Sequence, residues 1–506
     1  MNLVTRSAAW LRAEGGAAPV WGTFAASLIL SLIALAPGGL NRDGMLYSEA
    51  ARAFVEGGLP AAKAVFSWPF LAVLMGGLSR LTGLAPETAG HVLNALFLGG
   101  ACALMVDMVR RQEPRLAWLA GLVILALPGL NDYRNELIRE YGCWFFTLVA
   151  FRLALEWPAR PGWGLALGIQ AAIALAALFR PEAAVFYAAV LGWQHFQASP
   201  ASRLRRWTVL GSLPALALAA LLIAHFSGAL PGNSRLAGEI SRFDFSGFDA
   251  TAKAMGQAFN PYARDSAQTA HAILFFGSLA LIPWKLLWKF GPFLLPLLFF
   301  ARSPARPVAT ARYSLLAVAF VCHTLVLAVF VLRMQFVSGR YLGPLLLFAT
   351  PFVALGLMSL LDRLPRWRWG VIALCVVLAL ANVTSLGGAK KRQFRDAGQW
   401  LAAQAKVEDP SIFLASARTA HYAGWRFSTR AGKELDRDKL SAEVAAGRYR
   451  LVILEVSRKD PDFGDWLTRS GLREVRRFPG DSGEAVVVAE PLRDGASPPQ
   501  GSRAQP

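Results

Sequence analysis

VWGTFAASLILSLIALAPGGL, residues 20–40, contains 21 residues without a charged side chain. About 20 consecutive apolar residues suffice for a helix that crosses the hydrocarbon core of a bilayer. The next segment, NRDGMLYSEAARAFVEGG (41–58), places an arginine and an aspartate directly in front of an amphipathic helix. No A-x-A cleavage signal follows the apolar run, so we interpret it as an uncleaved anchor. We expect the chain to leave the membrane here and to continue along its surface.

Similar apolar runs recur along the chain, whose 506 residues are 55% hydrophobic. This composition excludes an ordinary soluble globular protein and is typical of a chain that crosses a membrane many times. The other long runs cover residues 88–106, 162–179, 183–201, 207–230, 313–332, 341–361 and 369–389, and shorter candidates cover 116–130, 141–157 and 284–301. We predict a mostly α-helical transmembrane bundle with about eleven spans.

The net charge of +19 would suit a nucleic-acid partner, but the positions of the basic residues argue against one. If the amino terminus is cytoplasmic, arginines gather in every second loop, at 110–115, 203–206, 302–312 and 363–368. An excess of Lys and Arg in cytoplasmic loops is the usual signature of membrane topology. We therefore predict a multi-pass protein of a bacterial inner membrane, in contact with membrane lipids and with no nucleic acid.

The composition changes after about residue 389. We predict a transmembrane domain over 1–389, which includes a first periplasmic loop at 41–87, followed by a small soluble periplasmic α/β domain over 390–490. Residues 491–506 are rich in Pro, Gly and Ser and are expected to be disordered. Within the α/β domain we expect helices at 394–405 and 438–447 and strands at 411–416, 449–456 and 484–491.

Ionisable residues lie at the expected outer ends of several spans, where charge is costly and often functional. They form four groups: Arg42 and Asp43; Asp132, Arg139 and Glu140; Arg180 and Glu182; Arg340 and Tyr341. Guanidinium groups bind phosphate oxygens in pairs, and a carboxylate can take a proton from an attacking hydroxyl. Together these residue types are suited to moving a group from a lipid phosphate to a hydroxyl.

Each group also has a purely structural interpretation. Asp43 is a favoured residue for capping a helix that starts at Gly44. The cluster around Arg139 and Glu140 could be a solvated loop with helical ion pairs, and Arg180 could end a helix by reaching towards the interface. Capping and catalysis are compatible at one aspartate, and both interpretations stay open for the arginines.

The order of the outer motifs resembles that of the polytopic GT-C-fold glycosyltransferases, broadly the protein O-mannosyltransferases and lipid A aminoarabinose transferases. The resemblance covers roughly residues 41–430 and rests on RDGMLYSEAARAFVEGG (42–58), FSWPFLAVLMGGLSRLTG (66–83), PETAGHVLNALF (86–97), ELIREYGCWFF (136–146), FRPEA (179–183) and GRYLGPLLLF (339–348). Two departures stand out. Many members have Asp-Glu where this chain has Asp43-Gly44, and Ser67-Trp68-Pro69 replaces the frequent His-Pro-Pro.

The resemblance implies a role for each group. Asp43 would be the general base, with Glu140 or Asp132 as a second acid. The donor phosphate would lie against a set of basic and aromatic side chains: Arg42, Arg139, Arg180, Arg340 and Tyr341. The donor would be a polyprenyl-phosphate-linked sugar, the acceptor a hydroxyl of a lipid, glycan or protein, and the reaction inverting.

The resemblance also bears on cofactors, and other functions remain as alternatives to it. Some GT-C enzymes use a divalent cation and others do not, and a single carboxylate in the first loop gives no strong metal signature. A transporter or flippase of a lipid-linked glycan is the main alternative, although transporters usually carry ionisable residues near the midplane and repeated halves. There are two further alternatives. One is a transferase that resembles the O-antigen ligases and uses a diphosphate donor, and the other is a non-catalytic scaffold.

Overall fold

The computed structural model describes residues 16–35, 39–197, 200–227, 245–259, 266–304, 306–386, 392–431, 435–457, 460–480 and 483–492. Their contacts form two compact units. The helical unit contains the described residues of 1–34 and 91–386, and the mixed unit contains those of 35–90 and 387–506. The mixed unit thus joins the first loop to the carboxy-terminal domain, whereas the sequence grouped that loop with the transmembrane domain. The tail expected to be disordered lies, from residue 493, outside the described residues.

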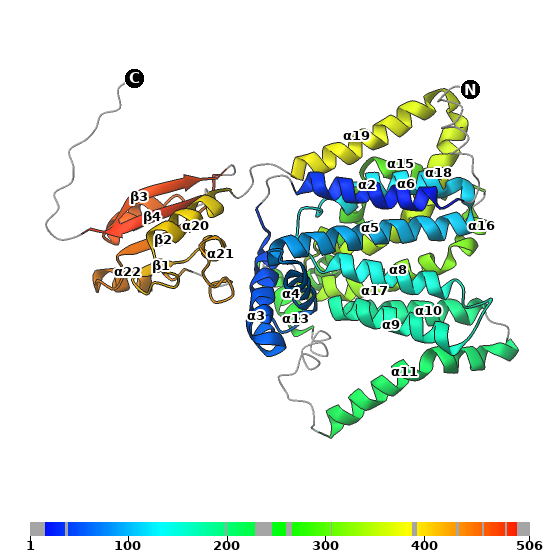
Figure 1. Ribbon diagram of the computed structural model, residues 1–506, viewed down its shortest axis with the longest axis horizontal. Helices are drawn as coiled ribbons and strands as arrows, with labels where there is room; N and C mark the ends of the chain where they lie inside the picture. Colours follow the sequence, from blue (N-terminus) through cyan, green and yellow to red (C-terminus); the bar gives the residue numbers. More distant parts are fainter. Residues whose placement is uncertain are drawn as a thin grey trace. The chain divides into compact units, whose positions relative to one another are not determined.

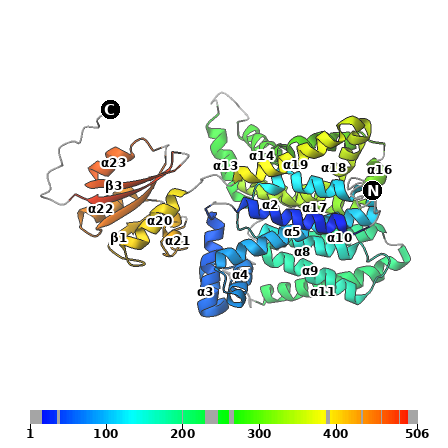
Figure 2. The same cartoon turned by 45° about the horizontal axis from the view of Figure 1, so that its top comes forward.

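The helical unit is a bundle of helices joined by short connections (Figures 1 and 2). Its α-helices are α2 (Ala18–Ala34), α5 (Pro86–Gln112, which starts in the mixed unit), α6 (Ala117–Ala126), α7 (Pro128–Asn131), α8 (Glu140–Ala154), α9 (Trp163–Phe179), α10 (Val185–Gln197), α11 (Pro200–Phe226), α13 (Ser246–Gln257), α14 (Ser266–Phe290), α15 (Leu294–Ala301), α16 (Arg306–Arg312), α17 (Ser314–Met334), α18 (Gly343–Arg363) and α19 (Arg368–Leu386). Short 3₁₀ helices connect them: η1 (Pro114–Leu116), η2 (Pro181–Ala184), η4 (Gly291–Phe293), η5 (Gly339–Leu342) and η6 (Pro365–Trp367).

Six helical stretches among the described residues are long and apolar enough to cross a membrane. They are Pro86–Gln112, Arg203–Ala224, Gln268–Ala301, Ser314–Met334, Gly339–Arg363 and Pro365–Thr384. The prediction of a mostly helical membrane protein is therefore confirmed. The other expected spans form helices of 10 to 17 residues, among them α2, α8, α9 and α10, so the total of about eleven stays a prediction.

Glycines allow several of these helices to pack closely. A Cβ at Gly142 of α8 would overlap the Phe179 ring of α9, and one at Gly343 of α18 would overlap the Trp144 ring of α8. A Cβ at Gly356 would collide with the backbone of α15. Small residues at helix interfaces are a common means of close approach inside membranes. The first two contacts bring the amino-terminal ends of α8 and α18 and the carboxy-terminal end of α9 together.

The carboxy-terminal part of the mixed unit is an α/β fold with one four-stranded sheet. Its elements are α20 (Arg392–Gln404), β1 (Ile412–Leu414), α21 (Ala417–Tyr422), α22 (Arg437–Ala445), β2 (Leu451–Val456), α23 (Phe463–Arg469), β3 (Leu472–Pro479) and β4 (Ala485–Pro491). The strand order is β1-β2-β4-β3; β1 and β2 are parallel, and β4 is antiparallel to both neighbours. The expected small α/β domain, its two helices and its three strands are thus present.

Strand β2 shows why this sequence forms the centre of the sheet. Successive side chains of a strand point to opposite faces. Leu451 and Ile453 pack with α20 and α21 on one face, while Val452 and Leu454 pack with α22 and α23 on the other. A strand buried on both faces is a nearly continuous apolar run, which explains LVIL at 451–454, and only Glu455 near its end is exposed.

The first loop contributes two helices to the mixed unit, α3 (Arg42–Val65) and α4 (Phe70–Thr82). Helix α3 bends at Gly57 and Gly58, where Gly58 has a φ of 69° that only glycine adopts easily. Helix α4 has 13 residues and is about 20 Å long, shorter than the roughly 30 Å hydrocarbon core. It is too short to cross the membrane alone.

Hydrogen bonds tie α3 to the carboxy-terminal part. The Tyr422 hydroxyl accepts from the Leu40 backbone N–H at 2.8 Å. The Glu49 carboxylate accepts from the backbone N–H of Ser428 at 2.9 Å and from its hydroxyl at 2.5 Å. The amino-terminal half of α3 is therefore fixed by residues 379 to 382 positions away in sequence.

Candidate functional site

A buried carboxylate lies between two arginines in the helical unit. Glu140, the first residue of α8, is 5% exposed. Its Oε1 lies 2.9 Å from Nη1 of Arg180 and 3.4 Å from Nε of Arg340. Arg180 Nε also lies 3.3 Å from Glu182 Oε2. Four residues from three separate segments thus form one charged cluster.

Local sequence explains how each arginine reaches the cluster. Arg180 precedes Pro181, and its extended backbone (φ −144°, ψ 111°) is the conformation that a following proline favours. The proline ends α9 and begins η2, so the arginine leaves the helix sideways. Arg340 lies in η5, and η5 is followed directly by Gly343 of α18. The contact of Gly343 with Trp144 holds this segment against α8.

The cluster lines a small cavity at the ends of these helices. Tyr341 forms part of its wall, with the Arg180 guanidinium 4.8 Å and the Arg340 guanidinium 5.4 Å from the centre of its ring. The rest of the lining is mainly apolar: Cys143, Trp144, Ala183, Phe186, His323, Val326, Leu327, Phe330 and Pro344. The cavity therefore combines two fixed guanidinium groups with a surface suited to a hydrocarbon chain.

The carboxylates keep the arginine charge in place. Arg180 lies in the connection between α9 and α10, where burial alone would lower its pKa. The adjacent Glu140 and Glu182 carboxylates outweigh this effect, and the pKa of Arg180 lies above its ordinary value. The guanidinium is a permanent cation whose orientation is set by its two acidic neighbours.

Two of the other candidates lie outside this cavity. Asp132 forms an ion pair with Lys289 of α14, and the Lys289 ammonium lies 5.1 Å from the centre of the Tyr133 ring. Arg139 immediately precedes α8 but is not among the residues that line the cavity.

A residue without an assigned role in the sequence interpretation anchors this region instead. Arg134 is 3% exposed, and it donates to Asn131 Oδ1 at 2.6 Å, to the Ser27 backbone oxygen at 3.0 Å and to the Ser31 hydroxyl at 3.0 Å. Burial lowers the pKa of Arg134. The arginine binds the 131–140 connection to α2. Its place in the charge-rich segment 132–140 was the visible signal. Its partners on α2 are not visible in the sequence.

Arg42 and Asp43 belong to the mixed unit. Asn41, not Asp43, occupies the cap position of α3, so the interpretation of Asp43 as a cap for a helix beginning at Gly44 is wrong. Asp43 lies in the first turn and is half-buried, and Arg42 is exposed. Arg42 lines a second cavity, formed with the α/β part of this unit. Within the described residues, no group of three or more His, Cys, Asp or Glu is placed to hold a metal ion.

Fold and site together define a class: a helical membrane protein with an arginine–carboxylate cluster beside an apolar cavity, and a mixed α/β unit. No family model matches the chain, and no curated protein matches it in sequence. Among solved structures, the chain is similar to ArnT from Cupriavidus metallidurans in the apo state, with 14% identity and a TM-score of 0.45. It is also similar to ArnT from the same organism bound to undecaprenyl phosphate, with 14% identity and a TM-score of 0.47. Each match covers 93% of this chain and 97% of the other.

ArnT is a lipid A aminoarabinose transferase of the GT-C fold, the group that the outer motifs of the sequence resemble. At this identity and TM-score the likeness adds no residue roles.

Proposed function

We propose that this protein is a membrane glycosyltransferase that moves a sugar from a polyprenyl-phosphate donor to a hydroxyl of a lipid, glycan or protein. The single observation that carries the proposal is the pair of arginines, Arg180 and Arg340, fixed around the buried Glu140 beside an apolar cavity. Fixed guanidinium groups suit a phosphate, and the apolar lining suits the first part of a prenyl chain. We place the reaction on the periplasmic side of an inner membrane.

In the proposed reaction the acceptor hydroxyl oxygen attacks the anomeric carbon of the donor sugar. A new C–O bond forms while the bond between that carbon and the phosphate oxygen breaks. A carboxylate takes the hydroxyl proton, and polyprenyl phosphate leaves with the bonding electron pair. Direct displacement inverts the anomeric centre and leaves no covalent sugar–enzyme intermediate.

Arg180 and Arg340 would stabilise the charge that develops on the departing phosphate. Groups that are already oriented before reaction stabilise such charge most effectively, and Glu140 and Glu182 hold the Arg180 guanidinium in that way. We assign Asp43 as the general base, with Glu140 as a positioning acid. Tyr341 packs beneath both guanidinium groups. Arg42, Arg139 and Asp132 stay candidates for donor or acceptor contacts.

The test is release of polyprenyl phosphate from a panel of lipid-linked sugars by purified protein in detergent. Arg180→Gln and Asp43→Asn should each lower the rate by about 100-fold, because loss of phosphate stabilisation or of a general base costs that much. Arg477→Gln is the matched control, since Arg477 lies on the exposed face of β3 and pairs with Glu474. It should keep the wild-type rate.

The outcomes separate the rival functions. Full activity in Arg180→Gln would remove the arginine cluster from the mechanism, and full activity in Asp43→Asn would remove Asp43 as the base. Release of a diphosphate instead of a monophosphate would indicate the alternative donor class. Absence of release together with transfer of lipid-linked sugar between leaflets of a liposome would indicate a transporter.

A further inference from the structure

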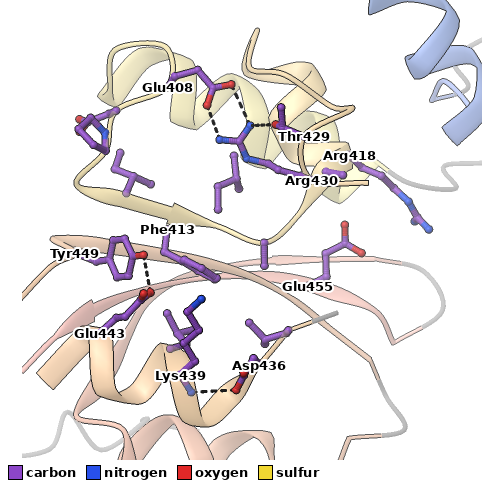
Figure 3. Close-up of a pocket in the computed structure, with 18 of the residues that line it drawn as sticks. Glu408, Phe413, Arg418, Thr429, Arg430, Asp436, Lys439, Glu443, Tyr449 and Glu455 are labelled. Atoms are coloured by element: carbon purple, nitrogen blue, oxygen red, sulfur yellow. Dashed lines mark hydrogen bonds and ion pairs between the residues drawn. The ribbon is translucent and has the colours of Figure 1, made fainter. Parts of the chain in front are cut away.

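The α/β part of the mixed unit contains a cavity of about 910 Å³. Its lining comes mainly from the 408–418 segment with Thr429 and Arg430, and from α22 with the two residues before it (Figure 3). This volume is at the upper end of the range usual for small-molecule sites, about 300 to 1,000 Å³. Its lining is rich in charge and also contains the rings of Phe413 and Tyr449, whose centres are 5.3 Å apart.

The acidic side chains of the lining are already engaged. Three of them contact arginines: Glu408 with Arg430 at 2.6 Å, Asp409 with Arg450 at 3.1 Å and Glu443 with Arg448 at 2.6 Å. Two accept from neutral donors: Asp436 from the Lys439 backbone N–H at 3.0 Å and Glu455 from the Ser416 hydroxyl at 2.7 Å. Figure 3 shows the Glu408–Arg430 pair on the far side of the hollow from Lys439.

Three cationic side chains of the same lining have no carboxylate partner among the described residues. Lys439 rises from α22 towards Phe413 (Figure 3). Arg418 lies at the rim near Glu455, and its guanidinium points away from the hollow, 4.5 Å from the centre of the Phe394 ring. Arg42 comes from the start of α3. Lys and Arg carry only donors, so the cavity offers uncommitted N–H groups to a ligand rich in acceptors.

The remaining lining restricts the ligand further. Asp436 and Glu455 are exposed carboxylates with acceptor capacity beyond their single neutral donors, and they suit hydroxyl groups. The exposed parts of Phe413 and Tyr449 provide apolar ring surface, which suits the carbon faces of a sugar ring. Inorganic phosphate would use only the cations and would fill little of the volume.

We propose that this cavity is a binding site for an anionic sugar, with the phosphate or carboxylate held by Lys439 and Arg42. Its hydroxyl groups contact Asp436 and Glu455, and its ring lies against Phe413 or Tyr449. The site is separate from the Glu140 cluster, whose lining shares no residue with it. It does not depend on the transferase activity.

The test uses the full chain in detergent with glucose 1-phosphate, glucose and inorganic phosphate as probes. Calorimetry should show binding of glucose 1-phosphate and a binding constant at least tenfold weaker for each of the other two. Amide hydrogen exchange should slow at 412–418 and 435–445 on addition of glucose 1-phosphate. An alkyl glucoside 6-phosphate, added to the micelle, distinguishes a lipid-linked sugar from a free one, and tighter binding of either form supports the site and assigns its source.

Lys439→Gln should weaken the binding of glucose 1-phosphate by about tenfold, the usual effect of losing a charged hydrogen bond. Arg418→Gln should have a much smaller effect, because its guanidinium points away from the hollow. Arg473→Gln is the matched control, because Arg473 is exposed on β3 outside the cavity, and it should bind like the wild type. Thermal unfolding of each variant checks that the unit is folded. Equal binding of inorganic phosphate and glucose 1-phosphate, no binding of any probe by folded wild type, or wild-type affinity in Lys439→Gln would each overturn the proposal.

Discussion

At the scale of single residues, Glu140 has the environment most sensitive to change. A carboxylate that is 5% exposed is tolerable only when it is paired and hydrogen-bonded. Its two arginine partners come from segments that follow α9 and precede α18. The carboxylate is therefore a structural link between these segments as well as a means of orienting the guanidinium groups.

Glu140→Gln keeps the shape of the side chain and removes its charge, so Arg180 and Arg340 lose their shared partner. Breaking a buried ion pair from one side costs about 3–5 kcal/mol. We expect the free energy of unfolding to fall by that order, measured by denaturant titration in mixed micelles. The double variant Glu140→Gln/Arg180→Gln should lose clearly less than the sum of the two single variants. Strict additivity would show that the two side chains do not interact.

A second residue-scale prediction concerns His421, which is 7% exposed in α21. Burial, with a further contribution from Arg52, lowers its pKa to about 4, although Glu87 Oε1 lies 4.0 Å from its Nε2. In the unfolded chain, His421 takes up a proton near its ordinary pKa of 6.5. Between pH 6.5 and 4 the unfolded state therefore binds more protons than the folded state. The contribution of neutral His421 to the free energy of unfolding is fully present above pH 6.5. It is lost as the pH falls towards 4, by about 3 kcal/mol at most.

Thermal unfolding of wild type and His421→Asn, followed between pH 7 and 4, measures this contribution. The difference in Tm between the two proteins should narrow or reverse as the pH falls, because the amide does not titrate. A difference independent of pH would mean that His421 is not buried in its neutral form.

At the scale of elements, α3 is held in place by side chains of the α21 region. Leu40 to Tyr422 and Glu49 to Ser428 are the two hydrogen-bonded attachments. Asp43 lies between them in sequence. The carboxy-terminal part of the mixed unit therefore determines the orientation of the helix that bears the proposed base.

Tyr422→Phe removes one attachment without changing packing, and Glu49→Gln weakens the other. Each hydrogen bond makes a net contribution of about 1 kcal/mol to stability. Amide exchange in the first turns of α3 should therefore accelerate about fivefold in each variant. Transferase kcat should fall while the donor KM stays the same. Thr468→Val is the control, since its hydroxyl bonds only within α23. Unchanged exchange in α3 would contradict the attachment.

The elements that the sequence predicts and those it misses differ in their side-chain patterns. LVILEV and AVVVAE are apolar and were predicted, because both are buried strands. Strand β3, LREVRRFP, was missed because its middle five residues are exposed and mostly charged. Charged side chains on an edge strand prevent pairing with other chains, and the same charge hides the strand from a hydrophobicity pattern.

At the scale of the whole molecule, the sequence predicts the membrane class but not the grouping of its segments. Arg180, Arg340, Tyr341 and Glu140 were chosen from local context, and the structure brings them to one cavity. Residues 35–90 form one unit with the carboxy-terminal residues. This grouping could not be predicted, because its contacts join distant positions such as Glu49 and Ser428, which no local sequence pattern relates.

The topology itself is testable. The excess of arginine in alternate loops predicts that the mixed unit faces the periplasm. A cysteine introduced at Arg448, which is exposed in the α/β part, should react in intact cells with a membrane-impermeant maleimide. One introduced at Arg115, which is exposed before α6, should react only after permeabilisation. The reverse pattern would invert the proposed orientation.

The mixed unit combines an early segment of the chain with its carboxy-terminal part, and this order matters when the protein is made. A ribosome synthesises the chain from its amino terminus, so α3 and α4 emerge well before Tyr422 and Ser428 exist. Residues 91–386 must be translated in between, which takes about 15 to 60 s at roughly 5–20 residues per second. During that interval the first loop waits without its partner. Completion of this unit is thus a late event in biogenesis, and a truncated or stalled chain would be left with a loop open to proteases.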